Sequence, residues 1–247
     1  MKTIAALASL ILSSHCLAQS LEQPAIHAGD TWHYQSTAER GPTGWTQTRD
    51  DVVVTRVTGS TIYFSQKQSG STQPVNEVFA GIDWSRIRDL NGKETVVGRP
   101  LSFPMSVGKT WSVQYTEQHP NKNHKSEQWD NKFTVVGYEN VEVPAGKFRA
   151  MKIECEGHCT AELEPAQAVV QAARTSEGNT SMVTEVNHTV PGSASGRVYK
   201  ALWYVPEVKR WVKSIDEYYS SGGVRNERYT NELVSFSAAE TPPQQQQ

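Results

Sequence analysis

The sequence predicts an all-β protein, built as a curved antiparallel sheet or an open barrel of meandering hairpins. Apolar and polar residues alternate with the period of a half-buried strand, most clearly from Trp111 to Thr116. Short β-branched and aromatic runs recur along the chain, and turn residues separate them. Without a leader, about 230 residues remain, which suits one large β domain or two small ones. We expect one domain, over residues 19–236.

The first 18 residues are typical of a secretory signal peptide. Lys2 supplies the positive charge, Ile4 to Leu12 the apolar stretch, and Ala18 a small residue before the cleavage site. The apolar stretch is shorter than the roughly 20 residues that cross a bilayer, so we expect no membrane span and a periplasmic or secreted protein. A lipoprotein signal with a lipidated Cys16 is the alternative, but His15 is not the small residue which that processing prefers.

Two hairpins are predicted in the N-terminal half. Val52–Val57 and Thr61–Ser65 are strand-like runs on either side of Gly59. Asn91 and Gly92 lie between two further extended runs. They predict a type I′ turn, because that turn needs positive φ at both central residues.

A third hairpin is predicted around Pro144. Val141 and Val143 lead into the turn, and Phe148 leads out of it. Pro144 sets the first corner of a type I turn, and Gly146 can take the left-handed position that follows the second corner. We therefore expect a three-residue loop with a glycine bulge. Backbone geometry explains this motif without a ligand.

The C-terminal third predicts an antiparallel meander. Its strand-like runs cover residues 197–205, 209–219 and 224–236, with turns at 206–207 and 220–223. The polar, proline-bearing tail over residues 237–247 is expected to be disordered.

An insertion over about residues 160–196 precedes this meander. Pro165 suits a first helical position, and Gly178 suits the position after a helix. The sequence therefore predicts one short helix inside the insertion.

Two segments of the chain begin alike. "AGDTWHYQST" starts at Ala28 and "VGKTWSVQYT" starts at Val107, and a valine-rich run follows each tryptophan after about 20 residues. This pattern is typical of a duplicated β unit. Chance similarity is the alternative.

Two cysteines, Cys155 and Cys159, lie outside the leader. In an oxidising compartment such a pair predicts a disulfide. An extended strand would hold the sulfur atoms too far apart, but Gly157 would let the chain turn back. The alternatives are free thiols, a redox pair, or a metal site with His158, although further zinc ligands are not evident.

The sequence carries no recognisable catalytic constellation. It contains no Gly-x-Ser-x-Gly elbow, phosphate-binding loop or dinucleotide fingerprint. The 24 basic and 26 acidic residues give a net charge of −2 without a positive cluster, which argues against a nucleic-acid partner. We therefore predict no catalytic residue, no metal and no cofactor.

Aromatic residues are the main candidates for ligand contacts. Trp203, Tyr204 and Trp211 flank the turn at Pro206. They could line a cleft for an apolar ligand. Alternatively, they fill the core, where aromatic side chains bury large areas.

Two motifs carry a family resemblance. "VEVPAGKFRAMKIE" resembles the Val-Pro-Ala-Gly-x-Phe hairpin of a family of exported bacterial β proteins of unknown function. In that family a Trp-Tyr-x-Pro-Glu-x-Gly stretch follows, and here "WYVPEVK" starts at Trp203, with Lys209 in place of the glycine. The resemblance covers roughly residues 107–236 outside the insertion. It implies an envelope location and a curved antiparallel sheet, and it implies no catalytic residue.

Three functional hypotheses follow. The first is a non-enzymatic binding or accessory protein of the cell envelope, which holds an apolar small molecule on a concave sheet face. The second is a structural subunit that binds another envelope protein by its sheet edge. The third is a hydrolase of envelope polymers, which would need two carboxylates facing each other across a cleft.

Overall fold

The computed structural model describes residues 20–41, 44–164, 173–177, 180–184 and 192–239. The predicted leader with Cys16 and most of the C-terminal tail lie outside these residues. The described chain is almost entirely β-strand, as the sequence predicts. The strands are β1 (Thr31–Arg40), β2 (Trp45–Thr58), β3 (Thr61–Gln68), β4 (Glu77–Gly81), β5 (Arg86–Leu90), β6 (Lys93–Gly98), β7 (Thr110–Asn121), β8 (His124–Val143), β9 (Gly146–Leu163), β10 (Ala173–Glu177), β11 (Thr180–Thr184), β12 (Ser193–Val205), β13 (Arg210–Ser220) and β14 (Arg225–Ser237).

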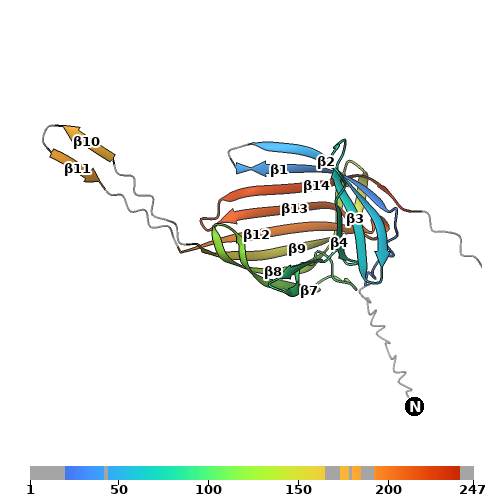
Figure 1. The fold of residues 1–247 in the computed structure, drawn as a ribbon. Helices are drawn as coiled ribbons and strands as arrows, with labels where there is room; N and C mark the ends of the chain where they lie inside the picture. The colour runs from blue at the N-terminus through green and yellow to red at the C-terminus, as the bar shows by residue number, and fades with distance from the viewer. Residues whose placement is uncertain (1–19, 42–43, 165–172, 178–179, 185–191, 240–247) are drawn as a thin grey trace, which may run out of the picture.

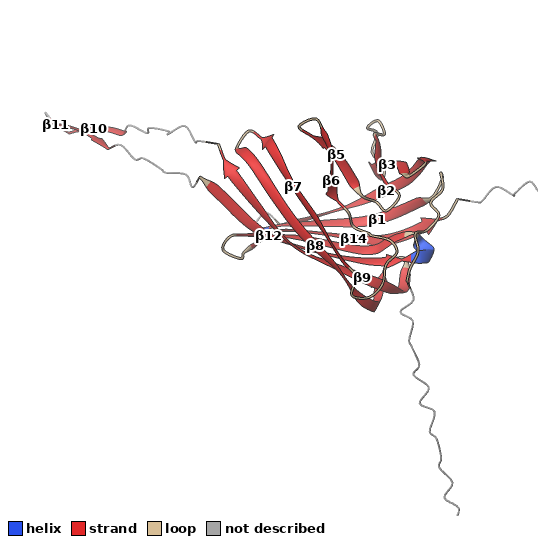
Figure 2. Ribbon diagram, turned by 90° about the horizontal axis from the view of Figure 1, so that it is seen from below, coloured by secondary structure: helices blue, strands red, loops and turns tan. Residues whose placement is uncertain are grey.

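Ten of these strands form one antiparallel sheet, in the order β4-β3-β2-β1-β14-β13-β12-β9-β8-β7 (Figure 1). The sheet does not close on itself, since β4 and β7 are its edges within the described residues. The β5–β6 hairpin lies between these edges, with β5 beside β4 and β6 beside β7 (Figure 2). The curved open sheet expected from the sequence is therefore confirmed.

Irregular pairings help to bend this sheet. The register shifts between His33 and Tyr34, between Val135 and Gly137, and between Trp203 and Tyr204. Such bulges increase the local twist and bend the strand that carries them. These bulges contribute to the curvature of the sheet, which gives it a concave inner face and an outer face.

The predicted hairpins are present. Gly59 turns between β2 and β3 with φ of 54°, and Asn91 and Gly92 connect β5 to β6 with φ of 58° and 80°. The loop at Pro144 is shorter than expected. Val143 pairs with Gly146, which leaves a two-residue loop and makes Gly146 the first residue of β9.

The expected disulfide between Cys155 and Cys159 is wrong. Both residues lie in the unbroken strand β9, and both thiols are free. Four residues of extended chain span about 13 Å, whereas a disulfide needs Cα atoms within about 7 Å. Gly157 does not turn the chain. Its missing side chain instead makes room for Asn131 on β8, whose Oδ1 would collide with a Cβ at Gly157.

The helix expected to begin at Pro165 and to end before Gly178 is also wrong where the structure describes it. Ala173–Glu177 forms β10, which pairs with β11, and the rest of the expected helix lies outside the described residues. The helical element that the described part of the chain does contain is the short 3-10 turn Pro206–Val208. The β-branched residues Thr175, Thr180, Val183 and Thr184 suit strands better than a helix.

The two similar segments adopt the same local geometry. Gly29 and Gly108 have φ of 96° and 85°, and each donates its N–H to a valine of the neighbouring strand, Val54 and Val135, at 2.8 Å. Each valine in turn donates back across 2.9 Å, to the residue that follows the glycine. This equivalence supports the hypothesis of a duplicated unit, which stays a prediction.

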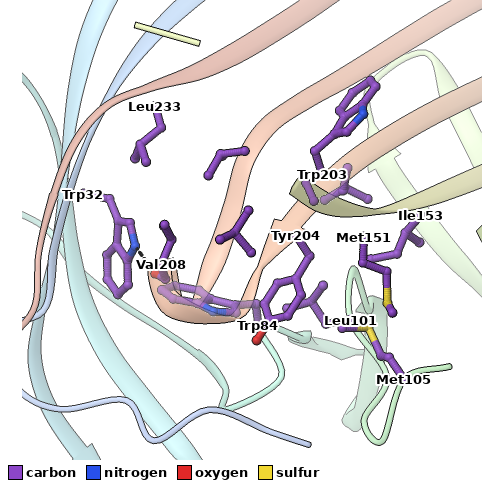
Figure 3. Close-up of a cluster of buried hydrophobic side chains, with 14 of the residues drawn as sticks. Trp32, Trp84, Leu101, Met105, Met151, Ile153, Trp203, Tyr204, Val208 and Leu233 are labelled. Carbon is purple, nitrogen blue, oxygen red and sulfur yellow. Dashed lines mark hydrogen bonds between the residues drawn. The ribbon is translucent and has the colours of Figure 1, made fainter. Parts of the chain in front are cut away.

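A core of large side chains fills one end of the inner face. Trp32, Tyr204 and Leu101 are fully buried, as are Met105 and Met151 (Figure 3). Trp32 stacks on Phe236 with ring centroids 5.4 Å apart. Its indole N–H donates to the carbonyl of Val208 at 2.8 Å (Figure 3). The first strand is thereby fixed to the turn that precedes β13.

Candidate functional site

A cavity of about 610 Å³ lies on the inner face of the sheet. Its walls come from β1 to β4, β7, β8 and β12 to β14. The β5–β6 hairpin adds Arg86 and Gly98, and Trp84 adds its ring. A volume of this size is typical of small-molecule sites. The cavity is therefore the candidate functional site.

The inner face changes from apolar to polar along its strands. Alternate residues of a strand share a face. Moving outward from the core, six strands change from an apolar or aromatic residue to a polar one within two positions: Tyr34 to Ser36, Val52 to Asp50, Phe64 to Gln66, Phe133 to Asn131, Leu202 to Lys200, and Leu233 to Asn231. Residue numbers rise toward the polar end in some strands and fall toward it in others, as expected of a sheet whose neighbouring strands are antiparallel. The cavity is therefore amphipathic, with a deep apolar end and a polar outer end.

Most polar groups at the outer end have partners. Asn231 accepts a hydrogen bond from Ser36 Oγ at 2.7 Å and donates one to Ser214 Oγ at 3.0 Å. Lys200 Nζ lies 2.7 Å from Asp216 Oδ1 on the neighbouring strand. Burial opposes the charge of Lys200, but the Asp216 carboxylate more than offsets this effect and raises the pKa of Lys200. Much of the polar band is thus internally paired, although Asn131 Oδ1 has no hydrogen-bond partner among the described residues.

Arg210 differs from this band. It is 8% exposed and lies at the apolar end of the cavity. Its guanidinium carbon is 4.3 Å from the ring centroid of Trp84 and 4.4 Å from that of Trp211, and Tyr34 and Trp32 follow at 5.2 and 5.7 Å. Its Nε and Nη1 atoms have no hydrogen-bond partner in the described part of the chain. A cation is thus buried among aromatic rings.

The turn before β13 positions Arg210. Pro206–Val208 forms the 3-10 turn, and Lys209 then takes the left-handed conformation with φ of 61°. Lys209 Nζ lies 2.8 Å from Asp30, a carboxylate with no exposed surface. This ion pair fixes the residue immediately before Arg210.

The aromatic residues singled out from the sequence separate in the structure. Tyr204 is fully buried and packs edge-on against Phe103, with ring centroids 5.6 Å apart. Trp203 is 7% exposed and lies beside the ammonium groups of Lys152 and Lys213. Among these three predicted residues, Trp211 alone lines the cavity. A ligand contact thus stays a prediction for Trp211, while the other two occupy packed positions.

Other aromatic residues of the cavity were not predicted. Tyr115 stacks on Trp129 across β7 and β8, with ring centroids 6.2 Å apart, and both line the cavity with Trp84. The alternation of apolar and polar residues that includes Tyr115 is visible in the sequence. Sequence reasoning did not place Trp84 and Arg210 together, because they approach only through long-range folding.

Two observations limit other kinds of site. Within the described residues, no group of three or more His, Cys, Asp or Glu side chains could hold a metal ion. None of the helices in the same residues is long and apolar enough to cross a membrane. Two carboxylates line the cavity, but Asp216 is paired with Lys200, and Asp50 accepts a hydrogen bond from Thr48 at 3.3 Å.

Comparison with known proteins identifies no family for this chain. No model of a protein family matches it, and no curated protein matches it. Solved structures give partial likenesses. A candidate lipoprotein of Parabacteroides distasonis has a TM-score of 0.42 at 13% identity, over 88% of this chain and 97% of the other. A candidate exported protein with a YmcC-like fold from Bacteroides fragilis has a TM-score of 0.38 at 14% identity, over 89% and 100%.

The hypothetical lipoprotein YmcC of Escherichia coli has a TM-score of 0.34 at 10% identity, over 84% of this chain and 86% of the other. These likenesses are distant. The class of the molecule therefore follows from its own geometry: an open, curved antiparallel sheet with an amphipathic cavity on its inner face.

Proposed function

We propose that this chain is a non-enzymatic binding protein of the bacterial cell envelope that holds an amphiphilic small molecule in the cavity. The observation that carries this proposal is the cavity itself, with a volume of about 610 Å³ and an apolar end followed by a polar band. An amphiphile places its apolar part against the rings and its polar groups near the polar band. The leader-like N-terminus supports the envelope location.

Binding fits the cavity better than hydrolysis. Glycoside hydrolysis uses two carboxyl groups that flank the scissile bond. Here the Lys200 ammonium neutralises Asp216, which leaves Asp50 as the unpaired carboxylate among the described cavity residues. A wall that joins an apolar, aromatic end to a band of polar side chains suits a site that holds an amphiphile.

A titration with four amphiphiles of equal chain length tests the proposal. Decanoate, decyl phosphate, decanol and decyltrimethylammonium are titrated separately into the protein by isothermal calorimetry. Saturable binding of at least one of them, with one molecule per chain, is the expected result.

A pair of matched variants shows where the amphiphile binds. Gln66 lines the cavity, whereas its neighbour Lys67 does not, because adjacent strand residues point to opposite faces. Gln66→Trp should weaken binding tenfold or more by filling the cavity, and Lys67→Trp should leave it unchanged. Absence of binding by all four amphiphiles, or equal weakening by both variants, would contradict the proposal.

A further inference from the structure

We infer that the ligand carries an acidic group, a carboxylate or a phosphate, and that Arg210 is the residue that binds it. This inference rests on the proposed function and specifies the chemistry of the ligand. A guanidinium group offers several N–H donors in a planar fork that matches the oxygen atoms of carboxylate and phosphate groups.

The first support is that Arg210 lacks a compensating charge. Burial of a cation is costly unless an anion or hydrogen bonds accompany it. No ion pair of Arg210 forms within the described residues, and its Nε and Nη1 atoms are buried without a hydrogen-bond partner there. The four surrounding rings stabilise the charge only in part, because cation–π contacts replace neither an anion nor the hydrogen bonds to its oxygen atoms.

Tyr34 cannot supply the missing anion. Its hydroxyl donates a hydrogen bond to the carbonyl of Trp211 at 2.6 Å. Burial raises the pKa of Tyr34 to about 12, although the charge of Arg210 and its hydrogen bond to the phenol oppose this rise. The phenol is therefore neutral near pH 7, and the positive charge of Arg210 stays uncompensated.

The other charges of the cavity largely balance one another. Four cationic residues line it, Arg86, Arg99, Lys200 and Arg210, against the two carboxylates Asp50 and Asp216, so that four minus two leaves an excess of two positive charges. Lys200 pairs with Asp216, and Arg99 Nε lies 3.2 Å from Asp83 outside the lining. Among the buried cations, Arg210 is thus the one that lacks an ion pair and that an anionic ligand would neutralise.

The four-amphiphile titration also tests this inference. Decanoate or decyl phosphate should bind at least tenfold more tightly than decanol, and decyltrimethylammonium should bind most weakly. Whichever of the two anions binds more tightly assigns the acidic group. If decanol binds as tightly as both anions, the inference fails while the proposed function stands. If no amphiphile binds, the proposed function fails and the inference fails with it.

Arg210→Gln should remove the preference for anions over decanol. Arg149→Gln is the matched control, because Arg149 is an exposed arginine that lies over the ring of Tyr138, outside the cavity, and its loss removes the same charge. The preference should persist in that control. Arg210→Lys keeps the charge but not the fork, so it should keep the preference with weaker affinity. An unchanged anion preference in Arg210→Gln, or its complete loss in a folded Arg210→Lys, would overturn the assignment.

Thermal unfolding separates a binding role from a structural one. Without ligand, Arg210→Met should unfold at the same temperature as the native protein or at a higher one, since it removes an uncompensated buried charge and keeps a long apolar side chain. With the same concentration of decanoate, the native protein should gain clearly more stability than the variant. A lower unfolding temperature for the variant without ligand, together with equal stabilisation by decanoate, would contradict the inference.

Discussion

Lys209 and Asp30 form an ion pair between the start of β13 and the turn that precedes β1. Lys209 Nζ lies 3.0 and 2.8 Å from the two oxygens of Asp30, and that carboxylate has no exposed surface. Asp30 also accepts the backbone N–H groups of His27 and Ala239, both at 2.9 Å. One carboxylate thus holds together three distant parts of the chain.

Loss of Lys209 should therefore destabilise the protein. Lys209→Met leaves Asp30 buried without its cation, and we expect the free energy of unfolding to fall by about 3 kcal/mol. Chemical denaturation measures this change. The double variant Asp30→Asn with Lys209→Met should lose less than the sum of the two single variants, since it leaves no unpaired charge. Strict additivity would show that the pair is not coupled.

The left-handed backbone of Lys209 gives a related prediction. A φ of 61° strains a residue with a side chain, and glycine adopts it freely. Lys209→Gly should thus be less destabilising than Lys209→Met by roughly 0.5–1 kcal/mol. Equal losses in the two variants would show that the conformation of Lys209 carries no strain.

The two equivalent glycines should both be sensitive to substitution. Gly29→Ala and Gly108→Ala each force a side chain into positive φ and should cost about 1 kcal/mol or more. Gly29→Ala should cost more, because its Cβ would lie 3.2 Å from that of Ala239, whereas nothing surrounds Gly108 within 4 Å. Gly222→Ala is the control and should change stability by less than about 0.5 kcal/mol. Equal tolerance at Gly108 and Gly222 would contradict the account.

The small size of Gly157 should matter more than its flexibility. Gly157→Ala introduces a Cβ that collides with Asn131, so we expect a loss of about 1–3 kcal/mol. Asn131 Oδ1 has no hydrogen-bond partner among the described residues, so its removal is tolerable. Adding Asn131→Ala to Gly157→Ala should therefore restore part of the lost stability. A double variant no more stable than Gly157→Ala would contradict this reason.

The thiols of Cys155 and Cys159 should stay reduced and unreactive. Burial raises their pKa to about 12 and about 11, and the charge of Glu127 adds to the rise at Cys159. The intact mass should therefore show no deficit of two hydrogens. Iodoacetamide should modify Cys159 before Cys155, and only slowly below pH 9, because the thiolate is the nucleophile. A mass lower by two hydrogens would contradict the observed strand geometry.

These raised pKa values also fix a pH dependence. The folded protein keeps both thiol protons to higher pH than the unfolded chain, in which cysteine titrates near pH 8.5. The thiols therefore contribute fully to stability below about pH 8.5, and that contribution falls as the pH rises toward 11 and 12. Denaturation of the Cys155→Ala, Cys159→Ala double variant should show a shallower decline between pH 8.5 and 11 than the native protein. An unchanged decline would exclude the thiols as its cause.

Local sequence signals predicted the strands well. Alternation in β7, the turn at Gly59 and the Asn91-Gly92 pair each define a hairpin through residues close together in the chain. Those signals do not depend on the rest of the fold. Lys209 lies at the end of the turn predicted at Pro206, and its positive φ is a conformation that glycine adopts more easily.

The failures came from choices that local sequence leaves open. Gly157 is compatible with a turn or with close packing, and only the partner Asn131 decides between them. The disulfide prediction therefore failed together with the turn on which it depended. Likewise, Arg210 follows Lys209 and resembles a solvated charge beside a turn. Its alternation with Val212 was the available signal for an inward position, whereas its contact with Trp84 depends on the long-range fold.

Native mass spectrometry of the mature protein, purified gently from its own compartment, shows whether the cavity holds a ligand. We predict an additional small mass that leaves on denaturation, and we predict its loss in Gln66→Trp but not in Lys67→Trp. A bare chain mass that persists after incubation with excess decanoate, decyl phosphate and decanol would contradict a ligand-binding role for the cavity.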